Sequence, residues 1–145
     1  AILGAFSYAN AVLIEQRIEG TEVAVTILDG DPLPVVEIQP KEGAYDFEAR
    51  YTAGATEFHV PARLDDAVAE RCQEVALAAC EAVGARHISR ADMIVSHEDD
   101  EPYLLELDTC PGLTDTSLVP QATQAAGMDF ADLCERLVEL ALDSA

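Results

Sequence analysis

The sequence ELDTCPGLTDTSLVP, residues 106–120, places two acidic residues, a tight turn and a helix start in one short run. Glu106 and Asp108 are two residues apart at the end of the apolar run 103–107. On a β-strand this spacing points both carboxylates to the same face. Two like charges on one face favour a bound cation between them. The alternative for this feature alone is an ordinary edge strand with solvated acids.

After the two acids the chain turns and starts a helix. Pro111 and Gly112 predict the turn, Ser117 is typical of an N-cap, and Pro120 falls in the first helical turn. Such a start leaves backbone N–H groups that can bind an anion. The run therefore predicts a combined metal and anion site, with a loop and a plainly capped helix as the alternative.

A second pair of charged residues lies on a neighbouring predicted strand. Arg90 and Asp92 are again two residues apart, within the predicted strand 88–95, and a hairpin joins that strand to 103–107. Three carboxylates and one guanidinium are therefore expected to converge. Oxygen ligands favour Mg²⁺ or Mn²⁺ over zinc, and Mg²⁺ commonly shares its remaining positions with phosphates. A cross-strand salt bridge on a solvated face is the other interpretation.

Length and charge limit the function further. The 145 residues fit one domain, and 8 Lys and Arg against 28 Asp and Glu give a formal net charge of -20. This balance argues against nucleic acid or an anionic membrane as a partner. No apolar run reaches a membrane span of about 20 residues and the start lacks a secretory signal, so we expect a cytoplasmic protein. Because residue 1 is not Met, we also expect this chain to be the end of a longer one.

The remaining pattern predicts an antiparallel meander followed by helices and a hairpin. A first strand is expected at 12–15, and residues 40–56 read as a long ordered loop. No two cysteines have C-x-x-C spacing, so they are expected to be reduced. The other expected strands are 22–28, 35–39, 57–62, 88–95 and 103–107, and the expected helices are 65–83 and 129–142, the latter with an apolar face of Phe130, Leu133, Cys134, Leu137 and Leu140.

Several of these segments together resemble one family. VVEIQPKEGAYDFEARYTAG, ISRADMIV and YLLELDTCPGLTDTSLVPQATQAAG are similar, in order and spacing, to the C-terminal half of a D-alanine-D-alanine ligase of the ATP-grasp superfamily. The resemblance implies an α+β fold, the C-terminal ATP-grasp subdomain, with a largely antiparallel sheet packed against helices. It also implies a peptidoglycan-precursor enzyme that uses ATP to join two D-alanines through an acyl phosphate.

The resemblance assigns roles at the nucleotide end of the site. It implies that two Mg²⁺ (or Mn²⁺) ions bridge the ATP phosphates, that a hinge strand binds adenine, and that one acid takes the ribose hydroxyls. The metal ligands would be Asp92, Glu106 and Asp108; the hinge strand would be Glu15, Gln16, Arg17 and Ile18; and Glu22 would bind the ribose.

At the acceptor end the resemblance implies an oxyanion site and a carboxylate site. Arg90 and the N–H of Gly112 would stabilise the oxyanion, while Ser117 and Leu118 would bind the carboxylate of the second D-alanine. Two further residues, Arg50 and Tyr51, would lie in a loop that closes over the site, and Tyr45 in the same loop favours D-alanine as the acceptor.

The chain departs from the family pattern at two positions. Asp108 stands where the family usually has Asn, which adds a negative charge beside the phosphates. Arg50 stands where the family usually has Lys, which keeps the charge but changes the contact geometry. Neither change removes a functional group.

Whole segments of the family pattern are missing. We expect residues 1–145 to form a single domain without the N-terminal substrate domain or the glycine-rich loop, and to be inactive as a ligase alone. The intact parent is expected to be a homodimer. Two alternatives are an ATP-grasp ligase with another acceptor, such as D-serine or an L-amino acid, and a non-catalytic binding or assembly module.

Overall fold

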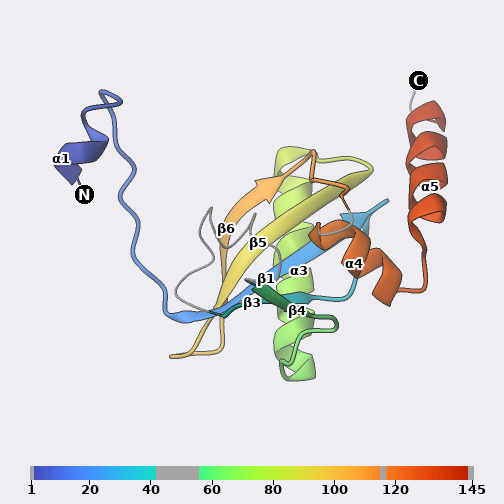
Figure 1. Cartoon of the computed structure of the whole chain (residues 1–145), viewed down its shortest axis with the longest axis horizontal. Helices are drawn as coiled ribbons and strands as arrows, with labels where there is room; N and C mark the ends of the chain where they lie inside the picture. The colour runs from blue at the N-terminus through green and yellow to red at the C-terminus, as the bar shows by residue number, and fades with distance from the viewer. Residues whose placement is uncertain (1, 42–55, 115–116, 144–145) are drawn as a thin grey trace.

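The computed structural model describes residues 2–41, 56–114 and 117–143. A six-stranded sheet, ordered β4-β3-β1-β5-β6 with β2 paired to β1, forms its centre (Figure 1). The strands are β1 (Gly20–Leu28), β2 (Asp31–Pro32), β3 (Val36–Pro40), β4 (Thr56–His59), β5 (Ile88–Ser96) and β6 (Pro102–Asp108). The helices are α1 (Ile2–Ala5), α3 (Asp66–Val83), α4 (Leu118–Ala125) and α5 (Phe130–Asp143). The pairings are antiparallel, which confirms the predicted α+β class.

Strand β1 divides the core into two sides. Its alternating residues point to opposite faces: Val23 and Val25 pack with Cys72 of α3, whereas Ala24 packs with Leu118 of α4. All these residues are buried. We call the two sides the α3 face and the α4 face.

Helix α3 has the boundaries that its periodicity predicted. Gly84, at φ 66°, ends it in the left-handed conformation, and its N–H bonds the carbonyl of Glu81. Cys72, within α3, is fully buried, and burial raises the pKa of its thiol to about 11. The Cys72 thiol therefore stays protonated at neutral pH. All four cysteines are free, as the sequence predicted.

Helices α4 and α5 cover the other end of the α4 face. Val119, Leu133 and Leu140 form one buried cluster with Leu28 of β1. The last helix was predicted correctly, but its apolar face was placed too widely, because Phe130 is 48 % exposed. No helix in the described part of the chain is long and apolar enough to cross a membrane.

The expected first strand at residues 12–15 is wrong. Residues 11–19 have no strand pairing, and Leu13 and Ile14 are 80 % and 69 % exposed. One physical reason is that β3 and β5 already occupy both edges of β1, the strand that follows the run, so the run cannot pair with β1. It extends from the start of β1 towards α1, away from the core (Figure 1). Most of the predicted loop 40–56 lies outside the described residues.

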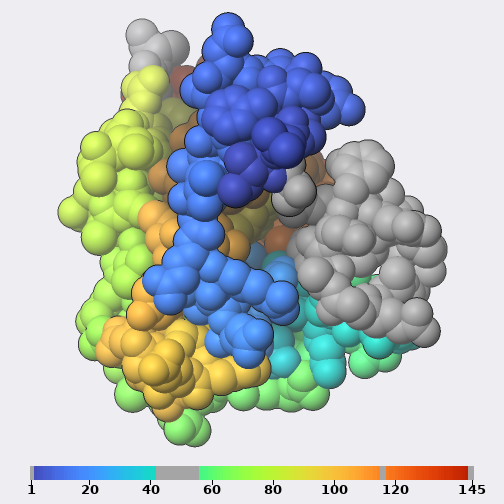
Figure 2. All heavy atoms as spheres, turned by 90° about the vertical axis from the view of Figure 1, so that its left-hand side faces the viewer, coloured from blue at the N-terminus to red at the C-terminus, as the bar shows by residue number. Residues whose placement is uncertain are grey.

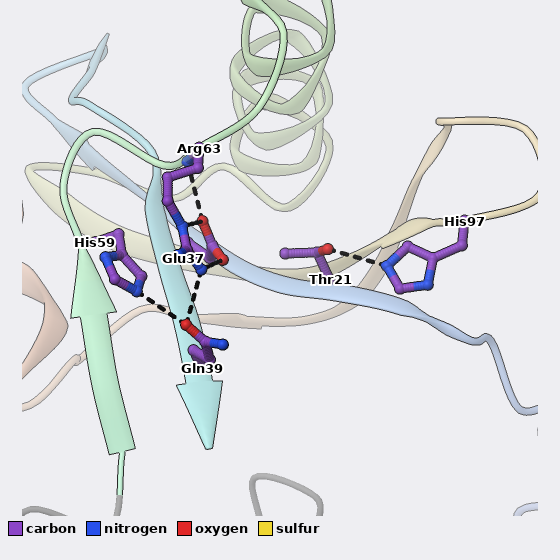
Figure 3. Close-up of polar contacts among 6 residues, drawn as sticks. All are labelled: Thr21, Glu37, Gln39, His59, Arg63 and His97. Atoms are coloured by element: carbon purple, nitrogen blue, oxygen red, sulfur yellow. Dashed lines mark hydrogen bonds and ion pairs between the residues drawn. The ribbon is translucent and has the colours of Figure 1, made fainter. Parts of the chain in front are cut away.

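On the α3 face, one ion pair fixes β3 to the start of α3. Glu37 is 6 % exposed, and its Oε2 accepts bonds from the backbone N–H and Nε of Arg63, each at 3.0 Å. Gln39 Oε1 accepts from Arg63 Nη2 at 2.8 Å and from His59 Nε2 at 3.0 Å (Figure 3). The bonds from Arg63 hold the pKa of Glu37 below its ordinary value. We call Glu37, Gln39, His59 and Arg63 the Glu37 network.

Candidate metal and anion site

The ends of β5 and β6 bring the four predicted charged residues together. In the ladder, Arg90 lies opposite Asp108 and Asp92 lies opposite Glu106. Directly opposed residues of antiparallel strands share a face, so all four side chains are on the α4 face. The expected convergence of three carboxylates and one guanidinium is the arrangement that this register produces.

Arg90 is the electrostatic centre of this group. Its Nε donates to Asp92 Oδ1 at 2.6 Å and its Nη2 donates to Asp92 Oδ2 at 2.8 Å, a bidentate ion pair. Nη2 also lies 3.7 Å from Asp108 Oδ2. Arg90 is only 9 % exposed, and its bonds to Asp92 raise the pKa of the guanidinium. In this structure, Arg90 therefore acts as the internal counter-ion of the acids.

A β-bulge interrupts the hairpin beside the acids, and the sequence analysis missed it. The register shifts between Asp92 and Met93, so Leu105 has no partner on β5. The available signal was the pair Leu104-Leu105, which breaks the alternation of a half-buried strand. As a consequence, Leu105 lies with Met93 at the wall of a cavity.

This cavity has a volume of about 360 Å³ and contains several predicted residues. It combines four acids, Glu15, Glu22, Asp92 and Glu106, with an apolar lining of Val23, Ile38, Met93 and Leu105. Its walls therefore offer both carboxylates and apolar surface. A cavity of this size and mixed lining suits a small polar molecule with one flat apolar part.

The N-terminal segment reaches this cavity through a single side chain. Glu15 is part of its lining, and Figure 2 shows the blue N-terminal segment crossing in front of the orange atoms of β6. Gln16, Arg17 and Ile18 do not line the cavity, and Arg17 lies 4.0 Å from Glu19 in an exposed pair. The hinge strand implied by the resemblance is not formed here, because residues 15–18 have no strand partner.

The residues predicted to bind the acceptor, Gly112, Ser117 and Leu118, lie together at the start of α4. A Cβ on Gly112 would lie 3.1 Å from Ser117 Oγ, so the missing side chain makes room for that hydroxyl. Ser117 stands at the N-cap position, yet its hydroxyl does not cap the helix. It accepts the Thr114 N–H at 3.1 Å instead. Among the described residues, the first turn of α4, beginning at Leu118, thus receives no side-chain cap from its N-cap residue at the positive end of the helix.

The donor set fits a hard divalent cation, but the acids are not arranged around one. Asp92, Glu106 and Asp108 supply the carboxylate oxygens that Mg²⁺ prefers. Among the described residues, however, no three acidic, His or Cys side chains lie close enough to hold a metal together. The ion pairs of Arg90 with Asp92 and Asp108 occupy two of the three predicted ligands. Arg50 and Tyr51 lie outside the described residues.

Comparison with known proteins gives a consistent result. The sequence signature of the family "D-ala D-ala ligase C-terminus" matches residues 1–139. The chain is 44% identical over 135 residues to the D-alanine--D-alanine ligase of Anaeromyxobacter sp. (strain K). The aligned region covers 93% of this chain and 44% of that relative. The chain is 45% identical over 140 residues to the ligase of Methylacidiphilum infernorum, covering 97% and 46%.

Solved structures show the same relationship. The D-alanine--D-alanine ligase of Bacillus anthracis superposes with a TM-score of 0.83 at 31% identity, covering 99% of this chain and 46% of that one. The same enzyme complexed with ATP gives 0.75 at 32% identity, covering 90% and 42%. The VanG D-Ala:D-Ser ligase of Enterococcus faecalis gives 0.70 at 30% identity, covering 87% and 37%. The chain spans less than half the length of the relatives it matches.

Proposed function

The chain belongs to the D-ala D-ala ligase C-terminus family, and on that basis we propose that it forms the C-terminal ATP-grasp part of an ATP-dependent D-alanine-D-alanine ligase. The reaction joins two D-alanines, with the first activated as an acyl phosphate. The observation that carries the proposal is the placement of Arg90, Asp92, Glu106 and Asp108 on one face, beside a cavity of about 360 Å³.

The cavity is proposed to bind ATP. Its apolar lining, including Leu105 and Met93, offers a surface for the flat adenine base, and Glu15 and Glu22 are proposed to bind the base and the ribose. Gln16, Arg17 and Ile18 remain proposed hinge residues. Arg50 is proposed to approach the phosphates from the closing loop.

Asp92, Glu106 and Asp108 are proposed to hold Mg²⁺ or Mn²⁺ at the phosphate end. When bound, the cation offsets the charge of the transferred phosphoryl group. This chain's own contribution is the register of β5 and β6, which puts the three carboxylates and Arg90 on one face of the sheet before any ligand arrives. Arg90 provides a positive charge in contact with Asp92 and Asp108, where it is proposed to stabilise a developing oxyanion.

The start of α4 is proposed to bind the second D-alanine. Ser117 does not cap its first turn, and the backbone N–H groups there, at the positive end of the helix dipole, are proposed to bind a carboxylate. The Ser117 hydroxyl can turn from Thr114 to that carboxylate, and the Leu118 backbone would also bind it. The N–H of adjacent Gly112 is proposed to share the oxyanion with Arg90. Tyr51 is proposed to lie in the loop that closes over these groups.

A chimera tests the proposal directly. The C-terminal segment of the Methylacidiphilum infernorum ligase, a relative 45% identical to this chain, is replaced by these residues. We expect D-alanine-dependent phosphate release from ATP, and none from the 145-residue chain alone. The matched variants are Glu106→Gln, expected to abolish release, and Glu37→Gln on the α3 face, expected to retain it. A folded chimera that releases no phosphate with D-alanine contradicts the proposal.

Acceptor choice is tested with the same chimera. We propose D-alanine as the acceptor, in a cytoplasmic, homodimeric enzyme. The similarity to the VanG D-Ala:D-Ser ligase makes D-serine the most informative competitor. Product formation with each acceptor at equal concentration distinguishes them, and a preference for D-serine would overturn the D-alanine assignment while leaving the ligase chemistry intact.

A further inference from the structure

One buried hydroxyl on the α4 face has no hydrogen-bond partner. Thr26 of β1 is 1 % exposed, and its Oγ1 is the unsatisfied buried side-chain atom among the described residues. Two residues to either side, Ala24 and Leu28 pack against α4 on the same face, so apolar surface flanks the hydroxyl. A buried hydroxyl without a partner lowers stability, because its bonds to water are not replaced.

Thr26 lies directly opposite Arg90 in the β1–β5 ladder. Opposed residues of antiparallel strands share a face, with Cβ atoms about 4.5–5.5 Å apart. An arginine side chain is longer than this separation and has five N–H donors. The hydroxyl of Thr26 is therefore a buried acceptor within the range of Arg90 rotamers.

The present bonds of Arg90 leave part of its donor capacity unused. Its Nε and Nη2 donate to both oxygens of Asp92, and the described contacts give its Nη1 no acceptor. Both oxygens of Asp92 point at Arg90 in this ion pair. A turn of the Asp92 carboxylate towards a cation would release at least one Arg90 N–H.

We propose that Thr26 is a positioning residue for Arg90: its hydroxyl accepts the Arg90 N–H that is released when Asp92 turns to a divalent cation. This inference rests on the proposed metal site. It explains why a chain would keep an unpaired hydroxyl in an apolar layer, since the hydroxyl is satisfied only in the loaded state. It also keeps the guanidinium directed at the site after Asp92 has left it.

The test uses the 145-residue chain and Mg²⁺ alone as the probe. Mg²⁺ affinity is measured from the amide shifts of Asp92 and Glu106, and the Nε–H signal of Arg90 is followed in parallel. Thr26→Val, which keeps the branched shape, is expected to weaken Mg²⁺ binding roughly two- to tenfold, the equivalent of one net hydrogen bond. Thr26→Ser, which keeps the hydroxyl, is expected to bind Mg²⁺ within about twofold of the wild type.

The melting temperature distinguishes this positioning role from a merely structural role of the Thr26 hydroxyl. Without Mg²⁺, Thr26→Val is expected to melt above the wild type, because a methyl group replaces an unsatisfied hydroxyl. A lower melting temperature would show that the hydroxyl already has a structural partner and would overturn the proposal.

A double variant isolates the partner. In an Arg90→Gln background, Thr26→Val is expected to leave Mg²⁺ affinity unchanged, since no guanidinium remains to be held. A full effect in that background, or equal affinities of Thr26→Val and the wild type, overturns the proposal while the metal site stands. Absence of any Mg²⁺ response in the wild type overturns the metal site, and this inference with it.

Discussion

The two faces of the sheet each carry an arginine bound to a carboxylate, yet only one of them resembles a site. On the α3 face, Glu37 receives three bonds from Arg63, so both its oxygens are used (Figure 3). On the α4 face, Arg90 shares its charge between Asp92 and Asp108. Beside it lies the unsatisfied hydroxyl of Thr26.

Unused hydrogen-bonding capacity separates the candidate site on the α4 face from the structural ion pair on the α3 face. Both arginines have raised pKa values because of their carboxylate partners, so the pKa shifts do not distinguish them. The α3 face needs no further ligand to complete its bonds. The α4 face has excess acids beside a cavity, so a ligand can bind without breaking the fold.

The largest expected effect on stability comes from disturbing the β1–β5 ladder, which both faces of the sheet share. A Cβ on Gly20 would lie 2.1 Å from the Val95 carbonyl oxygen, and backbone in a ladder cannot yield without opening it. Gly20→Ala is therefore expected to cost more than about 4 kcal/mol, as measured by chemical unfolding. Gly4→Ala, where nothing lies within 4 Å, is the control. Wild-type stability of Gly20→Ala would show that the ladder is looser than described.

The next largest effect is a loss of stability from a substitution on the α3 face. Glu37→Gln is expected to cost roughly 1.5–3 kcal/mol, because it removes the charge from the bonds to Arg63. Because the folded pKa of Glu37 is lowered, its contribution is complete above the unfolded pKa and is lost as pH falls through the folded value. Melting curves from neutral to acidic pH should therefore show the two proteins converging in stability at low pH. A constant difference at all pH values would contradict this assignment.

On the α4 face, removing a carboxylate should weaken Mg²⁺ binding without lowering the stability of the fold. Glu106→Gln is expected to weaken Mg²⁺ binding at least about tenfold, because a neutral amide is a poorer ligand than a carboxylate. Its melting temperature should stay near that of the wild type. Glu37→Gln serves as the reverse control, with lower stability and unchanged Mg²⁺ affinity. If both variants lost affinity equally, the contrast between the faces would fail.

The smallest expected effect concerns the residue that departs from the family pattern. Asp108 Oδ1 accepts the Cys110 N–H at 2.9 Å, and an asparagine oxygen can accept the same bond. Asp108→Asn is therefore expected to keep the loop and to weaken Mg²⁺ binding only about threefold, through the lost charge. The same titration measures it. An effect as large as that of Glu106→Gln would make Asp108 a principal ligand.

Much of the fold could be predicted because its signals are local. The period of the apolar residues and Gly84 determined α3, and i, i+2 spacing placed Arg90 with Asp92 and Glu106 with Asp108 on one face. The hairpin between them was short enough for their register to bring the pairs together. These parts depend on neighbours in sequence.

What could not be predicted depends on distant contacts. Glu37 and Arg63 are 26 residues apart, and no spacing rule links them. The run at 12–15 has strand composition, but both edges of β1, the strand that follows it, are occupied by β3 and β5. The bond of Ser117 to Thr114 in place of a cap, and the solitary hydroxyl of Thr26, also arise only when separate elements pack.

The most direct test of the central claim, that the α4 face holds a specific cation site, is a map of chemical shifts during Mg²⁺ titration of the wild-type chain. A net charge of -20 makes diffuse binding the competing outcome. The account predicts saturable shifts that concentrate at Arg90, Asp92, Glu106 and Asp108, while Glu37 and Arg63 stay unmoved. Shifts spread over the acidic surface without saturation would contradict it.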